Sequence, residues 1–252
     1  MTAPLLELLD LQAGYRDVPI IRGVSLSVDP GKVVCVIGPN GAGKSTVLKA
    51  TMGLLRIFGG EVRLAGEDIT RVATEKHVDM GIGYVPQVAN VFASLTVREN
   101  LILSVKQRRH QTAALEEVLA LFPELKPKLG AAAGALSGGE RQMLAFARCL
   151  ILKPRLLLLD EPTAALSPLL VGNVFKKIAE IAAMGTAILL VEQNALRALE
   201  ISDQAVVLSN GENAAAGTGA ELLANPRIKE LYLGGHSASP AAPREPVHAA
   251  SN

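Results

Sequence analysis

Residues 38–46 have the types and the spacing of a loop that binds phosphate groups. The segment reads Gly-Pro-Asn-Gly-Ala-Gly-Lys-Ser-Thr, which fits the pattern G-x-x-x-x-G-K-[ST]. Its glycines let the backbone curl until its N–H groups point inward at phosphate oxygens. A continuous apolar run at 33–37 predicts a buried strand before the loop, and helical spacing at 47–55 predicts a helix after it. This context favours nucleotide binding over a chance glycine-rich turn.

Individual side chains of this phosphate loop (38–46) have distinct expected roles. Lys44 would add a positive charge at the β- and γ-phosphates, and the Ser45 hydroxyl would bind Mg²⁺. The start of the following helix would favour the same anion through its N–H groups and dipole. The candidate nucleotide-binding residues of the loop are Gly38, Pro39, Asn40, Gly41, Ala42, Gly43, Lys44, Ser45 and Thr46.

Two acidic residues follow a second apolar strand. Four leucines at 156–159 lead directly into Asp160 and Glu161. Ligands of open α/β sheets bind at the carboxyl ends of the strands, so this strand would deliver both acids to the phosphates. We expect Asp160 to hold Mg²⁺ through water and Glu161 to polarise the water that attacks the γ-phosphate. The alternative is a solvated strand end without a chemical role.

The elements that position these residues predict an α/β fold, with a parallel sheet and helices on both of its faces. Helices alternate with apolar strands at 33–37, 82–85, 156–159, 186–191 and 204–208. Near the N-terminus, 5–15 and 20–28 read instead as strands of an antiparallel subdomain. The pattern becomes helical from about 88 to 153, which predicts an inserted α-helical subdomain. One domain would cover 1–234, and the Ala-, Pro- and Ser-rich segment 235–252 would be disordered.

The helical segment contains a second helix start that suits an anion. Thr96 and Glu99 predict a capping box for a helix at 97–109, and a further helix is expected at 112–121. The sequence Leu-Ser-Gly-Gly-Glu at 136–140 then opens another helix. A serine and two glycines at a helix start form an anion-binding site in their own right. Two such sites, far apart in one chain, require an explanation.

Composition excludes several classes of function. The net charge is +1 over 252 residues, which gives no sign of a nucleic acid or an anionic surface as partner. No apolar run approaches the roughly 20 residues of a membrane-spanning helix, and no secretory signal is visible. Cys35 and Cys149 read as buried thiols of a reducing compartment. We expect a cytosolic chain that meets a membrane only through another protein.

With these motifs in this order, residues 5–233 resemble the ATP-binding cassette (ABC) ATPases. The resemblance implies ATP and Mg²⁺ as cofactors and a head-to-tail dimer as the working form. It implies that Tyr15 stacks on adenine. Gln87 would reach Mg²⁺ and the γ-phosphate, beside the place where a membrane permease docks.

The same resemblance assigns the remaining site residues. Ser137, Gly138 and Gly139 would contact the γ-phosphate of ATP held by the other protomer. The metal ligands would be Ser45, Gln87 and Asp160. The catalytic residues would be Glu161 as the base, Lys44, and Gln193 in the switch position.

Two positions depart from the family pattern. Gln193 stands where most members carry a switch histidine, and Ser167 stands where most carry an aspartate. A neutral amide can still hydrogen-bond a phosphate oxygen, but it cannot carry the charge of an imidazolium. The resemblance therefore leaves two arrangements open, a homodimer and a heterodimer with a histidine-bearing partner.

Four short segments resemble the second ATPase subunit of branched-chain amino-acid importers, the LivF type: 81–87, 121–123, 166–168 and 191–194. Such a chain would hydrolyse ATP at the cytoplasmic face of the inner membrane. It would work with permease subunits, a second ATPase subunit and, indirectly, a periplasmic binding protein.

Other functions remain as alternatives. The cargo could be urea or a short amide, and a lipid or lipopolysaccharide exporter is the nearest rival, although Gln193 disfavours it. A non-transport ABC ATPase that acts on nucleic acid usually has tandem cassettes or basic insertions, which this chain lacks. A soluble phosphotransferase would not need the motif at 136–140.

Overall fold

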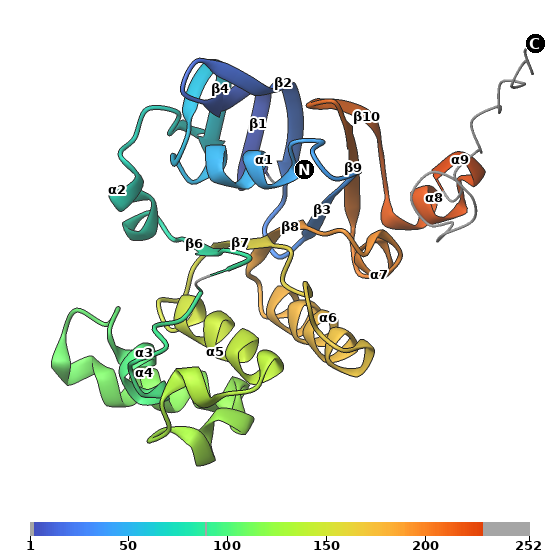
Figure 1. Ribbon diagram of the computed structural model, residues 1–252. Coiled ribbons are helices and arrows are strands. Elements are labelled where there is room, and N and C mark those ends of the chain that lie inside the picture. The colour runs from blue at the N-terminus through green and yellow to red at the C-terminus, as the bar shows by residue number, and fades with distance from the viewer. Residues whose placement is uncertain (1–2, 89, 229–252) are drawn as a thin grey trace, which may run out of the picture.

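The computed structural model describes residues 3–88 and 90–228, and a six-stranded sheet lies at its centre (Figure 1). Strands β9, β3, β8, β7 and β6 follow one another in parallel, and β10 pairs antiparallel with β9. Their bounds are β3 (Val33–Ile37), β6 (Ile82–Val85), β7 (Leu156–Asp160), β8 (Ala187–Val191), β9 (Gln204–Ser209) and β10 (Glu212–Gly217). The expected parallel α/β sheet is confirmed.

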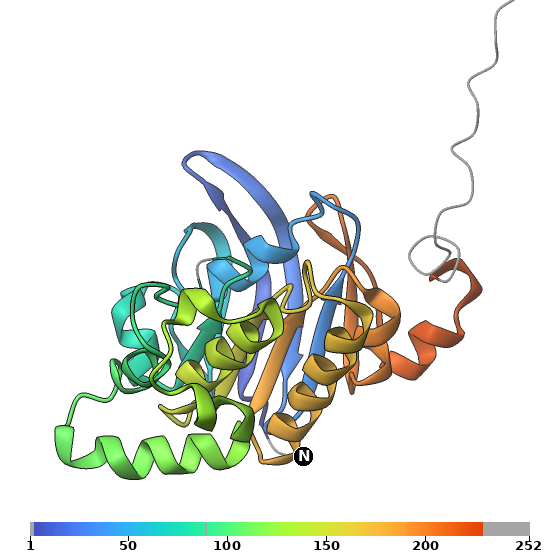
Figure 2. The same cartoon turned by 60° about the horizontal axis from the view of Figure 1, so that its bottom comes forward.

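Successive residues of the buried strands point to opposite faces of this sheet and divide the core into two clusters. Cys35 and Leu157 belong to the cluster covered by helices α5 (Gly138–Leu150), α6 and α7, whereas Val36 and Leu158 belong to the one covered by α1 and the antiparallel sheet. Figure 2 shows α5 and α6 in front of one face of the sheet. The helices outside the inserted segment are α1 (Lys44–Thr51), α2 (Thr74–Asp79), α6 (Pro168–Ala183), α7 (Ala195–Glu200), α8 (Gly219–Ala224) and α9 (Pro226–Ile228).

A second, antiparallel sheet of four strands packs over α1. Its order is β2, β1, β4, β5, and the bounds are β1 (Leu6–Tyr15), β2 (Val18–Val28), β4 (Arg56–Leu64) and β5 (Glu67–Asp68). Leu6, Leu8 and Leu11 are fully buried between this sheet and the central one. The predicted N-terminal β subdomain is confirmed, and it carries Tyr15 at the end of β1.

The segment between β6 and β7 is helical, with the elements α3 (Val97–Ile102), α4 (Arg108–Leu121), η1 (Pro123–Lys128), η2 (Ala133–Ala135) and α5 (Gly138–Leu150). The Thr96–Glu99 capping box is confirmed. The prediction of one helix over 97–109 is wrong, because the chain turns after Ile102 and α4 starts afresh at Arg108. With the turn in place, Leu101 of α3 and Leu115 of α4 both enter the same core cluster.

Other differences are small. Helix α1 ends at Thr51 instead of Leu55, because Gly53 adopts φ +72° and closes the helix. The segment 235–252, which the sequence predicts to be disordered, lies outside the described residues. Within 3–88 and 90–228, no helix has both the length and the apolar character needed to cross a membrane.

Candidate functional site

Four parallel strands deliver the candidate residues to one edge of the central sheet. The register pairs Val36 of β3 and Asp160 of β7 with the same residue, Val191 of β8, and pairs Val85 of β6 with Leu159. The segments that follow these strands therefore start side by side. They are the phosphate loop after β3, the residues from Pro86 after β6, Glu161 after β7, and Glu192 after β8.

The phosphate loop has the conformation that its glycines predict. Gly38 has φ +154°, and a Cβ atom there would lie 2.3 Å from the carbonyl oxygen of Leu208. Gly43 has φ +99° and precedes the first turn of α1. The ammonium group of Lys44, which is 5% exposed, donates to the carbonyls of Gly38 (3.0 Å) and Pro39 (3.2 Å) and so points along the inner side of the loop.

Two of the three candidate metal ligands, Ser45 and Asp160, are in direct contact, whereas Gln87 contacts Glu161. The hydroxyl of Ser45 donates to Oδ1 of Asp160 at 2.7 Å, and the hydroxyl of Tyr84 donates to Oδ2 at 3.3 Å. Asp160 is 3% exposed. Burial, and then the charge of Asp160, raise the pKa of Tyr84, so this phenol stays protonated. A hydroxyl and a carboxylate side by side are the oxygen donors that Mg²⁺ prefers, so these residues fit the ion.

Glu161 lies between two other candidates. Its Oε1 is 4.0 Å from Nζ of Lys44, and its Oε2 accepts a hydrogen bond from Nε2 of Gln87 at 2.9 Å. Its backbone has φ +45°, which is uncommon for a residue with a Cβ atom, and its N–H donates to Val191 at 2.9 Å. Such backbone conformations cluster at functional sites. The structure brings Lys44, Gln87 and Glu161 together.

The segment after β8 contains a buried carboxylate, Glu192, which is 2% exposed. It accepts hydrogen bonds from Thr163, in the loop after Glu161, and from the backbone of Gln193 and Asn194. Burial raises the pKa of Glu192 above its usual value, and the hydrogen bonds oppose this shift. The Gln193 side chain is exposed and shares a pocket with Glu161.

Tyr15 lies at the end of β1 and is 47% exposed. Its hydroxyl accepts a hydrogen bond from Nζ of Lys49 at 3.2 Å, and the same ammonium group is 5.8 Å from the ring centroid. Lys49 belongs to α1, the helix that follows the phosphate loop. A flat, exposed ring is thereby held against α1, and its stacking on a purine stays a prediction.

The second anion-binding motif starts α5. The Ser137 hydroxyl accepts from the N–H of Glu140 at 3.4 Å, and the Glu140 carboxylate accepts from the N–H of Ser137 at 2.9 Å. Lys128, at 2.6 Å, and then the Ser137 N–H lower the pKa of Glu140 to about 2. Ser137 and Gly138 are exposed, while Gly139 packs against Leu170. Among the residues described, no hydrogen bond or ion pair joins this motif to the phosphate loop.

Three residues at this edge escaped the sequence interpretation: Tyr84, Thr163 and Glu192. Tyr84 is one residue before the end of β6, and its link to Asp160 depends on the pairing of β6 with β7. Glu192 follows five apolar residues, the same signal that identified Asp160. That signal could have found it, had Gln193 not been the focus.

Comparisons with known proteins agree with this geometry. A family model described as ABC transporter matches residues 21–164. A probable branched-chain amino acid transport ATP-binding protein LivF of Archaeoglobus fulgidus is 42% identical over 91% of this chain and 99% of its own length. The lipopolysaccharide export system ATP-binding protein LptB of Haemophilus influenzae is 34% identical over 89% of this chain and 95% of its own length.

A solved structure extends the comparison to the fold. A nucleotide-free ATP-binding cassette from an ABC transporter superposes with a TM-score of 0.82 at 28% identity, covering 92% of this chain and all of the other. The family match spans the phosphate loop, Asp160 and Glu161, and the relatives cover about nine-tenths of the chain. The chain therefore belongs to the ABC transporter family, among its ATP-binding proteins.

Proposed function

We propose that this chain is the ATP-hydrolysing subunit of an importer for branched-chain or other hydrophobic amino acids. The observation that carries the proposal is the cluster at the sheet edge, where Ser45 contacts Asp160 and Glu161 contacts both Lys44 and Gln87. Phosphoryl transfer depends mainly on positioning and on charge neutralisation, and this cluster has the groups for both.

Each residue of the cluster has a role in hydrolysis. The loop N–H groups and Lys44 bind the phosphates, and the Glu161 carboxylate accepts a proton from the attacking water. Gln87 orients that carboxylate through its amide, and the amide of Gln193 donates to a γ-phosphate oxygen. Mg²⁺, held by Ser45, Asp160 and Gln87, would neutralise charge that develops on the phosphates.

The motif at 136–140 supports a two-subunit site. Ser137 and Gly138 are exposed at the start of α5 and make no polar contact with the phosphate loop of the same chain, within the part that the structure describes. The Ser137 N–H is used by the capping box, so the Ser137 hydroxyl and the Gly138 N–H are the donors that serve ATP bound to another cassette. With Gln193 in the switch position, we propose a second, histidine-bearing ATPase subunit as that partner, and a homodimer as the alternative.

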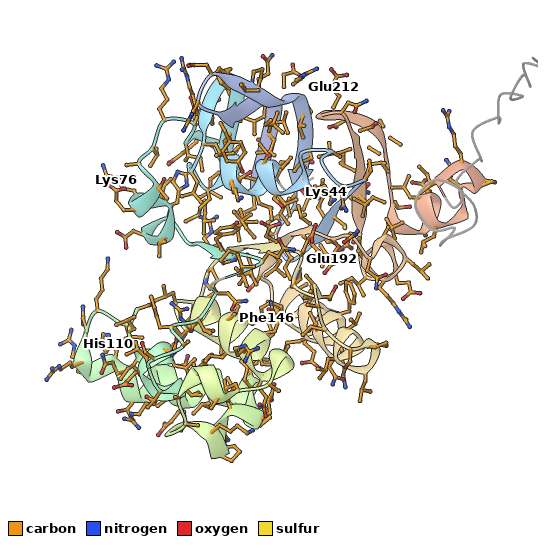
Figure 3. All side chains as sticks on the ribbon, in the orientation of Figure 1. Lys44, Lys76, His110, Phe146, Glu192 and Glu212 are labelled. Carbon is orange, nitrogen blue, oxygen red and sulfur yellow. The ribbon has the colours of Figure 1, made fainter. Side chains whose placement is uncertain are left out.

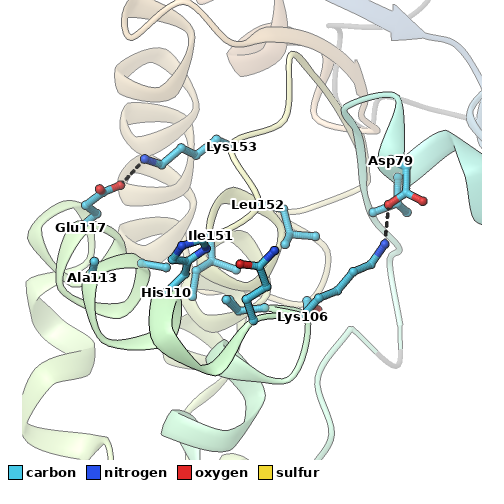
Figure 4. Close-up of a pocket in the computed structure, with 13 residues that line it drawn as sticks. Asp79, Lys106, His110, Ala113, Glu117, Ile151, Leu152 and Lys153 are labelled. Carbon is cyan, nitrogen blue, oxygen red and sulfur yellow. Dashed lines mark hydrogen bonds and ion pairs between the residues drawn. The ribbon is translucent and has the colours of Figure 1, made fainter.

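A groove beside α2 and α4 suits a segment of a membrane permease (Figure 4). A hollow of about 720 Å³ is lined by Val78, Lys106, His110 and Leu152, and ion pairs Lys106–Asp79 and Lys153–Glu117 flank it. A second hollow shares Val78 and Leu152 and reaches Tyr84, which donates to Asp160. A permease segment docked there would lie next to Tyr84, which in turn contacts the candidate metal ligand Asp160. This docking would occur at the inner face of the membrane.

The assignment of the cargo depends only on similarity to known proteins. The relative at 42% identity is described as serving branched-chain amino acids, and the one at 34% as serving lipopolysaccharide export. The higher identity favours import of amino acids over export of lipopolysaccharide. Urea and short amides remain alternative cargoes, since binding and permease subunits select the cargo.

The first test compares the purified full-length chain with its Glu161→Gln variant, with and without the cognate second cassette. We expect Mg²⁺-dependent hydrolysis by the wild type, and at least about a 100-fold slower turnover in the variant because the proton acceptor is lost. ATP should trap the variant as a dimer. Wild-type turnover that requires an added small acceptor would instead indicate a phosphotransferase.

A second measurement addresses the cargo. Deleting the gene should abolish high-affinity uptake of leucine, isoleucine and valine, and a plasmid-borne wild-type copy should restore it. Normal uptake of these amino acids in the deletion strain would contradict the cargo and leave the ATPase assignment intact.

A further inference from the structure

We propose that Glu192 is a positioning residue for ATP hydrolysis, one that ties the loop carrying Thr163 to the loop carrying Gln193. This inference rests on the proposed function, because it concerns the same catalytic edge. Glu192 is not expected to touch ATP. It would act by fixing two loops, each of which presents a side chain to the γ-phosphate.

The two oxygens of the carboxylate divide their contacts between the two loops. Oε1 accepts from the hydroxyl of Thr163 at 2.8 Å and from its backbone N–H at 3.1 Å. Oε2 accepts from the N–H of Gln193 at 3.2 Å and from that of Asn194 at 3.4 Å. One oxygen thus serves the loop after Glu161, and the other serves the loop with the switch glutamine.

The anchor of this bridge is rigid. The N–H of Glu192 donates to Val36 of β3 at 3.3 Å, so its backbone is fixed to the strand that leads into the phosphate loop. Glu192 and Thr163 are both buried, with exposed fractions of 2% and 7%. Figure 3 shows Glu192 in the central part of the molecule. The bridge therefore fixes the positions of both loops relative to the phosphate loop.

The contact set requires a carboxylate rather than any other polar group. All four hydrogen atoms come from neutral donors, and no ion pair to Glu192 exists among the described residues. A charge buried without a cation is costly unless hydrogen bonds compensate it. A fold that retains such a charge gains either local stability or positioning from it. Its place between Glu161 and Gln193 favours positioning.

Replacement by an amide separates the two possibilities. In Glu192→Gln, only one of the two positions keeps an acceptor, because the amide NH₂ has donors alone. The NH₂ group would face either the donors of Thr163 or the N–H groups of Gln193 and Asn194, so one of the two loops would lose its hydrogen bonds to residue 192. The matched control is Asp203→Asn. Asp203 also accepts a backbone N–H, from Val33 at 2.9 Å, but at the opposite end of β3.

The kinetic test uses the full-length chain assembled as in the first experiment. We expect Glu192→Gln to lower kcat for ATP hydrolysis about tenfold or more and to leave KM for ATP within about twofold, because misplaced groups slow the reaction without weakening phosphate binding. Asp203→Asn should stay within about twofold of wild type in both constants. Thr163→Val should lower kcat, and Thr163→Ser should restore it, since serine keeps the hydroxyl donor.

The double variant Glu192→Gln with Thr163→Val tests whether the two residues act as one unit. Its kcat should be within about twofold of the worse single variant. Multiplied losses, or a Glu192→Gln kcat within twofold of wild type, would overturn the proposal.

A readout without turnover separates this inference from the proposed function. Amide hydrogen exchange of the nucleotide-free chain should be faster in Glu192→Gln at Thr163 or at Gln193 and Asn194, and unchanged there in Asp203→Asn. Unchanged protection of both loops would refute the bridge. A wild-type chain that never hydrolyses ATP would count against the proposed function, and the exchange result would still decide whether the bridge exists.

Discussion

At the scale of single residues, two hydroxyl groups hold the carboxylate of Asp160, one at each of its oxygen atoms. Ser45 donates to one oxygen and Tyr84 to the other, at 2.7 and 3.3 Å. The carboxylate is therefore held in one orientation before any cation arrives. Tyr84 also lines the hollow that continues the proposed permease groove, so one side chain connects the groove to a candidate metal ligand.

Tyr84→Phe tests this connection. Loss of one hydrogen bond to Asp160 should raise the Mg²⁺ concentration for half-maximal ATPase activity about three- to tenfold, as expected for about 1 kcal/mol. At saturating Mg²⁺, kcat should return to near the wild-type value. The measurement is a Mg²⁺ titration of ATPase activity at fixed ATP. An unchanged half-saturation point would show that the Tyr84 hydroxyl does not position Asp160.

At the scale of elements, α5 depends on its first turn. Its N-terminus carries both the exposed Ser137 and the Glu140 carboxylate that closes the capping box, and Lys128 pairs with that carboxylate. The folded state favours ionised Glu140, whose pKa is lowered to about 2. Stability from this contact is therefore complete above the ordinary glutamate pKa and is lost as the pH falls toward 2.

Glu140→Gln should lower the free energy of unfolding by about 1 kcal/mol at pH 7, the typical contribution of a helix cap and a partly exposed ion pair. The difference from wild type should shrink as the pH falls from about 4.5 to 2, since the wild-type carboxyl then becomes protonated. Urea unfolding at a series of pH values measures it. Glu117→Gln, which breaks an exposed ion pair with Lys153, should have a smaller effect. A difference that is constant with pH would contradict the assignment to Glu140.

Another element-scale feature is the link between the catalytic edge and the inserted helices. Gln87 contacts Glu161 at one end of this link, whereas Phe92 exchanges two hydrogen bonds with the buried Asn100 at the other. Arg148 of α5 lies over the ring of Phe92 at 4.6 Å. The far end of the link is thus attached to the inserted helices and the near end to the catalytic edge. Under the proposed function, this segment would connect the permease to ATP.

At the scale of the whole molecule, the two anion-binding helix starts belong to different parts of the structure. The phosphate loop lies between the central sheet and the antiparallel sheet, and α5 packs on the opposite face (Figure 1). Under the proposed function, a single chain would bind ATP with one part and offer the other part to a second molecule.

Substitution at each helix start should separate binding from turnover. Ser137→Arg should leave the dissociation constant of ATP for the full-length chain within about twofold of wild type and lower ATPase turnover of the assembled pair at least about tenfold, because charge and bulk replace the capping hydroxyl. Lys44→Ala should weaken ATP binding itself. A fluorescent ATP analogue and an ATPase assay measure the two constants.

Thr218→Arg is the matched control, since Thr218 caps α8 through the same kind of capping box. It should leave turnover near the wild-type value. Weakened ATP binding in isolated Ser137→Arg chains would indicate that the motif serves the ATP of its own chain.

Features that depend on local chemistry could be predicted from the order of the residues alone. The phosphate loop, the acids after four leucines, the Thr96–Glu99 capping box and the strand order along the chain could all be predicted, because glycine spacing, apolar runs and capping residues act over a few neighbours. For the same reason, the sequence identified Lys44, Ser45, Asp160 and Glu161 as one candidate site.

Contacts between distant segments could not be predicted in this way, because they form only when the chain has folded. Glu192 meets Thr163 across 29 residues and Tyr84 meets Asp160 across 76, and both contacts depend on strand pairing that no local pattern encodes. The break after Ile102 likewise serves packing against α5 and not the helix propensity of its own residues. Finally, only the folded structure shows that Glu192 is buried and that its carboxylate is hydrogen-bonded to two loops.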